Sequence, residues 1–311
     1  MKILFIDTTH PLLKKELEKE NYICDTAYKK NKTEIQNIIH NYDGIIIRSR
    51  FIIDKQFINC ASKLKFIARA GSGLENIDVD YAKSKNINCY NVPEANRQAV
   101  AEHALGMLLS LFNNLNKTDK EVRSGIWRRE ENRGKELKGK TIGIIGYGNN
   151  GSAFAKLLKG FDVKILAYDK YLNEHDYKTT MALIYKEADV VSLHIPLTLE
   201  TTHLVNHLFI RNFQKKIYLI NTARGKCINT KDLVLALENG EIKGACLDVL
   251  EYEKKSFEKL NKKWQTTEMQ YLINSEKTIL SPHIAGWTKE SNIKIAIALS
   301  KKIIHYEQNK V

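Results

Sequence analysis

One glycine-rich segment constrains the fold of this chain more than any other feature. Residues 141–155 read TIGIIGYGNNGSAFA, so an apolar run leads into the spacing G-x-G-x-x-G and then into helix-forming residues. Glycines at this spacing let a strand turn sharply into a helix, and the third glycine lets that helix pack closely against the strand. The segment therefore predicts a buried strand at 141–145, a tight turn, and a helix at 152–159.

The same segment predicts a dinucleotide site made by Gly146, Tyr147, Gly148, Asn149, Asn150 and Gly151. Gly148 lets the backbone approach a pyrophosphate, and the helix N-terminus offers N–H groups to its charge. Asp169 ends the next expected strand, where a carboxylate accepts hydrogen bonds from ribose hydroxyls and repels a 2′-phosphate. This favours NAD over NADP, although the adjacent Lys170 weakens the preference. Asn150 is polar where an apolar side chain would pack better.

Strand and helix patterns alternate along most of the chain, which is typical of parallel sheets covered by helices on both faces. In the first hundred residues we expect strands at 2–6, 22–26, 44–48, 65–69 and 87–91, with a helix at 11–20 among the connections. In the second block we expect strands at 141–145, 163–168, 190–194, 217–221 and 244–248, and helices at 152–159, 232–239 and 287–306. A long helix at 97–116 joins the blocks, and 254–276 is charged and without pattern, as in a surface excursion. The pattern predicts an α/β fold with two doubly wound, Rossmann-like parallel-sheet domains.

Composition excludes several classes of protein. The net charge is +13, but the lysines are scattered in short pairs with no basic block interleaved with aromatics, which disfavours a nucleic-acid partner. No apolar run approaches the roughly 20 residues that span a bilayer, and the N-terminus has no signal-peptide core. The five cysteines form no C-x-x-C pair, as expected for reduced thiols. We therefore predict a cytoplasmic protein with no membrane association and no metal site.

Three segments near the ends of expected strands carry groups suited to reducing a 2-keto acid. Arg224 can hold a carboxylate and polarise a carbonyl, because its guanidinium offers a planar fork of donors. His283 can exchange a proton near neutral pH, and Glu253 can orient it and stabilise its protonated form. The residues alone leave a second interpretation open, in which these are a surface arginine, an exposed glutamate and a capping histidine.

The chain resembles the D-isomer-specific 2-hydroxyacid dehydrogenase family from end to end. The resemblance lies in the fingerprint with Asp169, in HIPLT at 194–198, NTARG at 221–225, DVLEYE at 248–253 and PHIAG at 282–286. It implies an NAD-dependent oxidoreductase in which Arg224 binds the substrate carboxylate and carbonyl, His283 is the acid/base and Glu253 its partner. It also implies cofactor contacts from His194, Ile195, Pro196, Thr222, Ala223, Asp248, Ala285 and Gly286. Asp248 would contact the nicotinamide amide.

The resemblance further implies the domain organisation. A discontinuous substrate-binding domain would comprise 1–97 and 288–311, and an NAD-binding domain would comprise 98–287, with the active site in the cleft between them. The family forms homodimers through the NAD-binding domain, using the helix near 101–111. His103 on this helix is expected to be a packing or dimer-interface residue, and His203, His207 and His305 to be surface residues.

Within the family, the loop segments resemble the subgroup that oxidises D-3-phosphoglycerate in the first step of serine biosynthesis. The small anionic substrate would then be bound by Arg48, Ser49, Arg50, Gly71, Ser72, Gly73 and Asn96. Arg48 and Arg50 would bind the phosphate, and amides of the 71–73 loop the carboxylate. Trp287 departs from the small polar residue of many relatives. An alternative substrate is an unphosphorylated acid such as D-lactate, glycerate, glyoxylate or hydroxypyruvate. A different class, a cofactor-sensing corepressor-like protein, also stays open.

Overall fold

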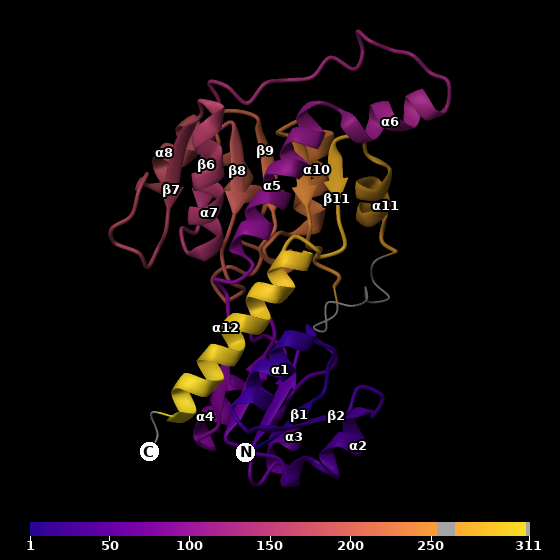
Figure 1. Ribbon diagram of the computed structural model, residues 1–311. Coiled ribbons are helices and arrows are strands. Elements are labelled where there is room, and N and C mark those ends of the chain that lie inside the picture. The colour runs from indigo at the N-terminus through magenta and orange to yellow at the C-terminus, as the bar shows by residue number, and fades with distance from the viewer. Residues whose placement is uncertain (254–264, 309–311) are drawn as a thin grey trace. The chain divides into compact units, whose positions relative to one another are not determined.

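The computed structural model describes residues 1–253 and 265–308 and confirms the α/β fold (Figure 1). The chain divides into two compact units, each built on one parallel sheet. Within the described residues, unit 1 comprises 1–96 and 287–308, and unit 2 comprises 97–253 and 265–286. Over this described part of the chain, no helix combines the length and apolar character that crossing a membrane requires.

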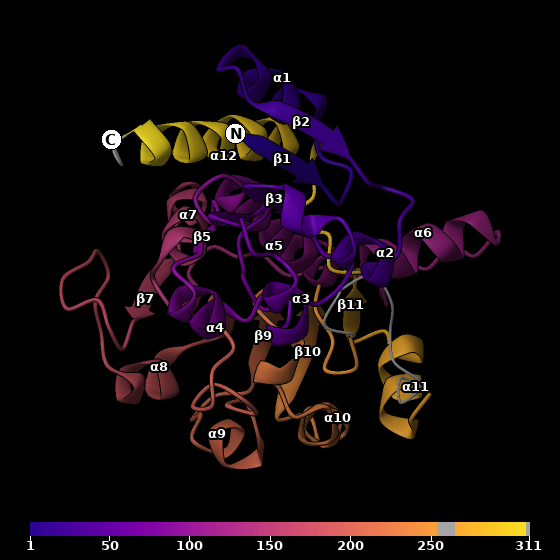
Figure 2. The ribbon, with the colours of Figure 1, turned by 90° about the horizontal axis from the view of Figure 1, so that it is seen from below.

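The sheet of unit 1 has five parallel strands in the order β2-β1-β3-β4-β5. The strands are β1 (Lys2–Phe5), β2 (Ile23–Thr26), β3 (Gly44–Ile47), β4 (Phe66–Arg69) and β5 (Asn88–Tyr90). Every residue of β3 and β4 is buried, because helices cover both faces of the sheet (Figure 2). Each strand overlaps a predicted one, and no end differs by more than one residue.

Alternate residues of these strands point to opposite faces and form two separate cores. Ile3 and Ile46 pack with Leu13 of α1 (Pro11–Lys19) and Leu299 of α12 (Lys289–Gln308). On the other face, Leu4 and neighbouring strand residues pack beneath α2 (Lys32–Gln36), η1 (Ile39–Asn41), α3 (Lys55–Asn59) and α4 (Val79–Ser84). The last helix of the chain thus completes the core formed by the first residues.

The sheet of unit 2 has six parallel strands in the order β11-β10-β9-β8-β6-β7. They are β6 (Thr141–Ile145), β7 (Lys164–Tyr168), β8 (Val190–Leu193), β9 (Ile217–Asn221), β10 (Ile242–Leu247) and β11 (Thr278–Leu280). A parallel bridge from Ala167 to Lys178 extends the sheet beyond β7. β6 pairs with both β7 and β8, so the strand order reverses beside it. Ligands of open α/β sheets bind at the carboxyl ends of strands at such a point.

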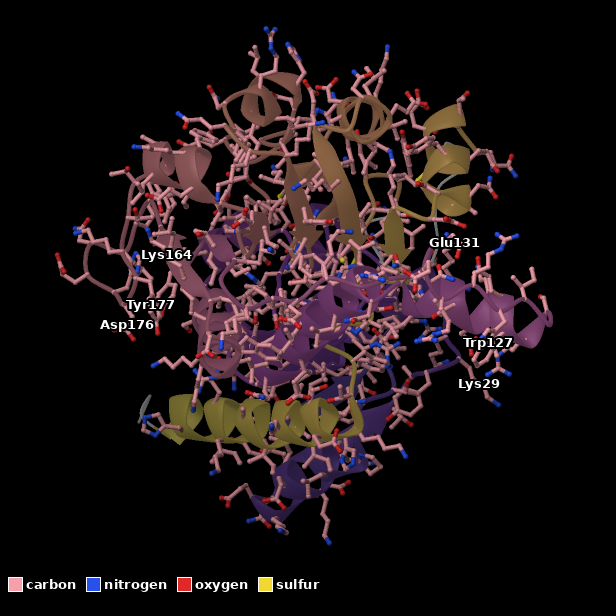
Figure 3. The ribbon with its side chains drawn as sticks, turned by 90° about the horizontal axis from the view of Figure 1, so that it is seen from above. Lys29, Trp127, Glu131, Lys164, Asp176 and Tyr177 are labelled. Atoms are coloured by element: carbon pink, nitrogen blue, oxygen red, sulfur yellow. The ribbon has the colours of Figure 1, made fainter. Side chains whose placement is uncertain are left out.

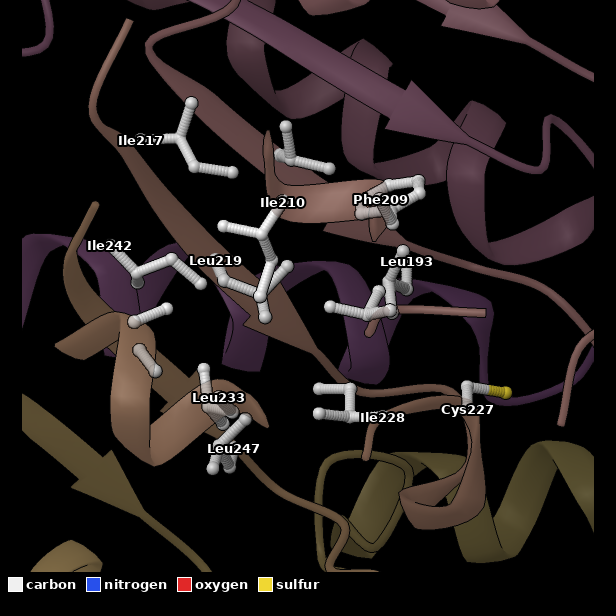
Figure 4. Close-up of a cluster of buried hydrophobic side chains, with 14 of the residues drawn as sticks. Leu193, Phe209, Ile210, Ile217, Leu219, Cys227, Ile228, Leu233, Ile242 and Leu247 are labelled. Atoms are coloured by element: carbon white, nitrogen blue, oxygen red, sulfur yellow. The ribbon is translucent and has the colours of Figure 1, made fainter. Parts of the chain in front are cut away.

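Helices cover both faces of this sheet as well. On one face lie α5 (Arg97–Phe112) and α7 (Asn149–Leu158), which η2 (Lys159–Phe161) follows. On the other face lie α8 (Met181–Glu187), α9 (His207–Arg211), η3 (Gly225–Cys227), α10 (Thr230–Glu238) and α11 (Thr267–Asn274). Figure 4 shows the core on this second face, where Leu193, Leu219 and Leu247 of the sheet meet Phe209, Ile210 and Leu233 of the helices.

Two sequence predictions need correction. The predicted helix at 97–116 is interrupted, because α5 ends at Phe112 and α6 (Leu115–Arg123) begins after Asn114. Asn114 has a left-handed backbone (φ 53°), a conformation that asparagine tolerates better than most residues. The predicted surface excursion at 254–276 contains α11, and its residues 254–264 lie outside the described residues. The short strand β11 was not predicted, because three partly buried residues give no recognisable pattern.

Candidate active site

The glycine fingerprint forms a tight, side-chain-free turn at the carboxyl end of β6. A Cβ added at Gly146, whose φ is 91°, would lie 2.4 Å from the carbonyl oxygen of His194. One added at Gly151 would lie 2.0 Å from the carbonyl oxygen of Gly146. By contrast, a Cβ at Gly148 would meet nothing within 4 Å. Packing therefore requires glycine at the first and third positions, whereas the second faces open space of the kind a pyrophosphate needs.

Helix α7 begins at this turn with no side chain capping its amides. Gly148 is the N-cap residue, and no side-chain hydrogen bond satisfies the first turn. Uncapped helix N-termini leave backbone N–H groups available and carry a partial positive charge. This end of α7 therefore suits a phosphate group, as the fingerprint predicts.

Asp169 follows β7, and three backbone amides converge on its carboxylate. Tyr147 donates its N–H to one oxygen at 2.7 Å, and Tyr171 and Leu172 donate theirs to the other at 2.9 and 3.0 Å. Partial burial acts to raise the pKa of Asp169, but these bonds outweigh it and the pKa lies below its usual value. The carboxylate is thus ionised at neutral pH, as repulsion of a 2′-phosphate requires.

Lys170, whose charge weakened the preference for NAD, has a carboxylate partner. Its Nζ lies 2.6 Å from Glu200 Oε2, and the hydroxyl of Tyr171 donates to the same oxygen at 3.3 Å. Glu200 was not among the residues singled out from the sequence, because 30 residues separate it from Lys170.

Three buried polar atoms near the fingerprint have no hydrogen-bond partner within the described residues. They are Asn150 Oδ1, His194 Nδ1 and Thr222 Oγ1, and all belong to predicted cofactor contacts. Because buried polar groups are normally hydrogen-bonded, this cluster fits a site completed by a polar ligand. Burial lowers the pKa of His194 to about 4, so its ring is neutral, and its Nε2 lies 2.9 Å from Ser192 Oγ. Ile195 and Pro196 continue the same loop after β8. The residues present therefore fit NAD.

Arg224 lies in a loop fixed by the end of β9. The fully buried Asn221 donates its side-chain amide to the carbonyl oxygen of Arg224 at 3.0 Å and accepts the N–H of Ala223 at 3.0 Å. A Cβ added at Gly225 would lie 2.0 Å from the carbonyl oxygen of Leu250, so the loop after β9 touches the loop after β10. The Arg224 guanidinium donates through Nη1 to the carbonyl oxygen of Ala223 at 2.7 Å.

His283 and Glu253, which are 30 residues apart in sequence, form a direct hydrogen bond. His283 Nδ1 lies 2.6 Å from Glu253 Oε2, and the other carboxylate oxygen accepts the N–H of Leu250 at 2.5 Å. An ionised carboxylate only accepts hydrogen bonds, so the proton of the neutral ring is on Nδ1. Nε2 is then the ring nitrogen that can accept a proton. This is the arrangement of an acid/base histidine oriented by a carboxylate.

The loop that carries His283 is held by Asp248, which is 1% exposed. The backbone of His283 is left-handed (φ 56°), and its N–H donates to the carbonyl oxygen of Asp248 at 2.7 Å. The Asp248 carboxylate accepts Ser281 Oγ at 2.6 Å and the N–H groups of Ile284 and Ala285 at 2.8 Å each. Its predicted contact with the nicotinamide amide stays a prediction, as does that of Gly286.

Comparison with known proteins identifies the family. Residues 105–285 match the model of the "D-isomer specific 2-hydroxyacid dehydrogenase, NAD binding domain". The chain is 35% identical over 281 residues to the "Hydroxypyruvate reductase" of Thermotoga maritima, covering 89% of each chain. The chain belongs to the D-isomer-specific 2-hydroxyacid dehydrogenases. It is therefore an NAD-dependent D-2-hydroxyacid dehydrogenase with two parallel sheets, and NAD is its cofactor.

Other relatives differ in their substrates. The dehydrogenase is 32% identical over 284 residues to the "D-3-phosphoglycerate dehydrogenase" of Bacillus subtilis, covering 89% of this chain but only 52% of that longer protein. It also superposes on the D-lactate dehydrogenase of Aquifex aeolicus complexed with NAD and lactic acid, with a TM-score of 0.83 and 28% identity. That match covers 99% of this chain and 96% of the other. The comparisons thus give the reaction class and leave the substrate open.

The predicted phosphate-binding segment of the dehydrogenase lies in unit 1, at the end of β3. The N–H groups of Arg48, Ser49 and Arg50 all donate to one oxygen of Asp7, at 2.7, 3.0 and 3.1 Å. Arg50 Nη1 also donates to the carbonyl oxygens of Ile6 and Ala27, at 2.9 and 3.1 Å. Sequence reasoning missed Asp7, whose only signal is an acid at the end of the first strand.

The Arg48 side chain contacts Trp287, the residue at which the sequence departs from many relatives. Its guanidinium lies over the ring of Trp287, 4.6 Å from the ring centre, so an aromatic face supports the charged group. The loop predicted to bind the carboxylate is also tied within unit 1. Ser72 Oγ donates to Asn96 Oδ1 at 2.7 Å, and Arg69 Nη1 donates to the carbonyl oxygen of Gly73 at 2.8 Å. A Cβ added at Gly71 would approach the Arg69 guanidinium to 3.0 Å.

No group of three or more His, Cys, Asp or Glu side chains could hold a metal ion in the parts of the chain spanning 1–253 and 265–308. All five cysteines are free thiols.

Proposed function

We propose that this dehydrogenase oxidises D-3-phosphoglycerate to 3-phosphohydroxypyruvate, the first step of serine biosynthesis, using Arg224, Glu253 and His283. The observation that carries the proposal is the 2.6 Å bond between His283 Nδ1 and Glu253. It supports a histidine whose Nε2 exchanges a proton with the substrate hydroxyl. Unit 1 is proposed to bind the substrate and unit 2 the cofactor.

Bound NAD supplies an acceptor for the hydride that leaves C2 of the hydroxy acid. His283 enters the reaction neutral, with its proton on Nδ1, and takes the hydroxyl proton on Nε2 as the C2–H bond breaks. Glu253 stabilises the resulting imidazolium through its charge. Arg224 holds the carboxylate and stabilises the negative charge that develops on the oxygen. Asp248 holds the loop around His283, so the imidazole keeps the same position in both directions of the reaction.

Two arginines support a phosphorylated substrate. The carbonyl bonds of Arg50 use Nη1 alone, and a guanidinium has three further N–H donors on Nε and Nη2. The Arg48 guanidinium lies over the Trp287 ring, and a guanidinium stacked in this way is a group suited to phosphate oxygens. The Asp7 carboxylate orients both residues through their amides.

A second candidate is the reduction of an unphosphorylated 2-keto acid such as hydroxypyruvate or glyoxylate, or the oxidation of D-lactate or glycerate. The same contacts favour it in one respect, because both arginines already have partners within unit 1 and so have a structural role without any phosphate. The Thermotoga maritima relative is named for the reduction of hydroxypyruvate.

The deciding experiment measures NADH formation with D-3-phosphoglycerate, D-lactate and D-glycerate, and NADH consumption with hydroxypyruvate and glyoxylate. A kcat/KM at least about tenfold higher for the phosphorylated acid supports the first candidate. A preference for an unphosphorylated acid moves the proposal to the second. Tight NADH binding without turnover of any acid would favour the cofactor-sensing protein instead.

Replacing His283 by alanine tests the catalytic trio. The variant should lose about 10²–10⁴ in kcat, because it removes the imidazole that is proposed to move the hydroxyl proton. NADH affinity, measured by fluorescence titration, should stay close to that of the wild type. An unchanged kcat would refute the assignment whatever the substrate is.

A homodimer through the NAD-binding domain remains part of the proposal. Most apolar side chains of α5 are buried within unit 2, whereas Leu115 and Val122 of α6 and the following Trp127 are exposed. Trp127, 76% exposed, lies close to α6 (Figure 3). Such neighbouring apolar groups are typical of an interface, and we propose that α6 contributes to it together with the predicted segment 101–111 of α5. Light scattering should give twice the chain mass, and Trp127→Ser should shift it toward the monomer.

A further inference from the structure

One histidine outside the proposed trio is connected to the loop that carries His283. His103 lies on α5, and its Nε2 is 2.8 Å from Ser281 Oγ and 3.6 Å from Asp248 Oδ1. Ser281 Oγ is in turn 2.6 Å from Asp248 Oδ1. The His103 side chain is 25% exposed and Asp248 is 1% exposed, so the chain of contacts runs from a half-buried ring to a buried carboxylate.

The chemistry of these three groups fixes the direction of each hydrogen bond. An ionised carboxylate can only accept, so the single hydroxyl proton of Ser281 is donated to Asp248. Ser281 Oγ must then accept from His103, which requires the proton of the neutral imidazole to be on Nε2. The result is a directed chain in which His103 donates to Ser281 and Ser281 donates to Asp248. Hydrogen bonds in such a chain polarise and strengthen one another.

The end of this chain is the residue that holds the His283 backbone. Within the described residues, the Asp248 carboxylate accepts three hydrogen bonds, and all come from 281–285, where His283 has a left-handed backbone that these bonds support. A left-handed backbone at a residue other than glycine is unfavourable and persists only where the surroundings enforce it. Loss of one of the three bonds would therefore loosen the loop at His283.

His103 also decides between two acceptors for the Ser281 hydroxyl. Met107 lies one turn further along the same face of α5, and its Sδ is 3.8 Å from Ser281 Oγ. A thioether is a weak acceptor, but it competes for the same proton when the hydroxyl can rotate. The N–H of His103 occupies a lone pair of Ser281 Oγ and so keeps the hydroxyl directed at Asp248.

We propose that His103 is a positioning residue for His283, acting through Ser281 and Asp248, and not a packing or interface histidine. The inference rests on the proposed function, because it takes His283 as the acid/base. It adds α5, far from the trio in sequence, to the elements that set the catalytic geometry.

The test compares two replacements of similar size, His103→Leu and His103→Gln. Glutamine can place an N–H donor near the position of Nε2, whereas leucine fills the space without a donor. We expect His103→Leu to lower kcat by about tenfold with the KM for the acid changed less than about twofold, because a small misplacement of an acid/base group mainly affects the chemical step. His103→Gln should keep more than about half of the wild-type kcat. His40→Leu, which replaces an exposed histidine of unit 1, serves as the control.

A double-mutant cycle separates the network from general destabilisation. Ser281→Ala should lower kcat as His103→Leu does, and the double variant should be no slower than the slower single variant, since both break one chain. Equal loss in the leucine and glutamine variants, or additive losses in the double variant, would overturn the proposal. Full activity of His103→Leu alongside an inactive His283→Ala would refute the positioning role alone, whereas an active His283→Ala would refute the proposed function itself.

Discussion

Both units have a loop at the carboxyl end of a strand where backbone amides face an anion, but the anion has a different origin in each. In unit 1, the amides of 48–50 bind the carboxylate of Asp7, which comes from the end of β1. In unit 2, the turn at 146–151 has no capping side chain, and a Cβ at Gly148 would meet only open space. The amides of one loop thus receive an anion from the chain itself, whereas the other loop is the one predicted to receive an anion from a ligand.

The difference explains why similar sheets suit different roles. A carboxylate built into unit 1 fixes the backbone of Arg48 and Arg50, so under the proposed function their side chains, and not their amides, would contact the substrate. Unit 2 leaves amides at α7 and buried polar atoms of Asn150, His194 and Thr222 without partners among the described residues. Unsatisfied polar groups make such a unit less stable without its cofactor, and cofactor binding is expected to stabilise it.

The largest expected effect comes from removing the built-in anion. Asp7→Ala should lower the free energy of unfolding by about 3 to 5 kcal/mol, because three amides would lose a charged acceptor at once. Urea unfolding followed by circular dichroism measures the change. Asp7→Asn keeps an acceptor oxygen and should lose only about 1 to 2 kcal/mol.

In the same variant, the loop at 48–50 should behave like the glycine turn of unit 2 and bind an anion from solution. In Asp7→Ala the amides of 48–50 would be open to an external anion, so phosphate should raise its melting temperature more than that of the wild type. Asp80→Ala, which removes an exposed carboxylate of unit 1, should show neither the loss nor the phosphate effect. A fully stable Asp7→Ala would mean that the two loops do not differ in the way described.

Acid should affect unit 2 through His194. Burial lowers the pKa of this ring from 6.5 to about 4, so the unfolded chain binds a proton more readily than the folded chain between these values. Stability is therefore full above about pH 6.5 and falls toward pH 4, by about 3 kcal/mol for this group. In urea unfolding without cofactor, His194→Asn should flatten the pH dependence in this window, whereas the exposed His40→Asn should not. Unaltered pH dependence in His194→Asn would show that the His194 ring is not responsible.

The smallest effect is expected from Gly148→Ala, which distinguishes a glycine needed for ligand binding from a glycine needed for folding. Gly148→Ala should keep the wild-type melting temperature, because a Cβ there touches nothing, yet weaken NADH binding by about tenfold, or about 1.4 kcal/mol. Gly106→Ala on α5, where a Cβ also meets nothing, is the matched control and should bind NADH normally. Fluorescence titration with NADH distinguishes the two, and equal affinities would place the pyrophosphate elsewhere.

Much of the fold follows from local patterns. Buried parallel strands such as β6 and β9 are continuous apolar runs, and the structure has them at the predicted residues. The break between α5 and α6 was missed, because the residues around Asn114 still have helical periodicity. β11 was missed because its pairing with β10, rather than its composition, makes it a strand.

The candidate site divides in the same way. Glycines with fixed spacing and a following acid are local signals, so the dinucleotide site could be found from them. The pairing of His283 with Glu253 was proposed from chemistry and family resemblance, and the 2.6 Å distance gives its geometry. Asp7, Glu200 and the contact of His103 with Ser281 gave no such signal, since each partner lies far away in sequence.

The sequence by itself determined the alternation of strands and helices, the glycine turn and the types of side chain that the chemistry needs. These depend on neighbours within a few residues and on the period of apolar positions. Only the tertiary structure decided which polar groups satisfy one another, which loop receives its own anion and which stays open to a ligand. A hydrogen bond requires its two atoms to lie within about 3 Å, and the packing of the sheet, not proximity along the chain, brings such atoms together.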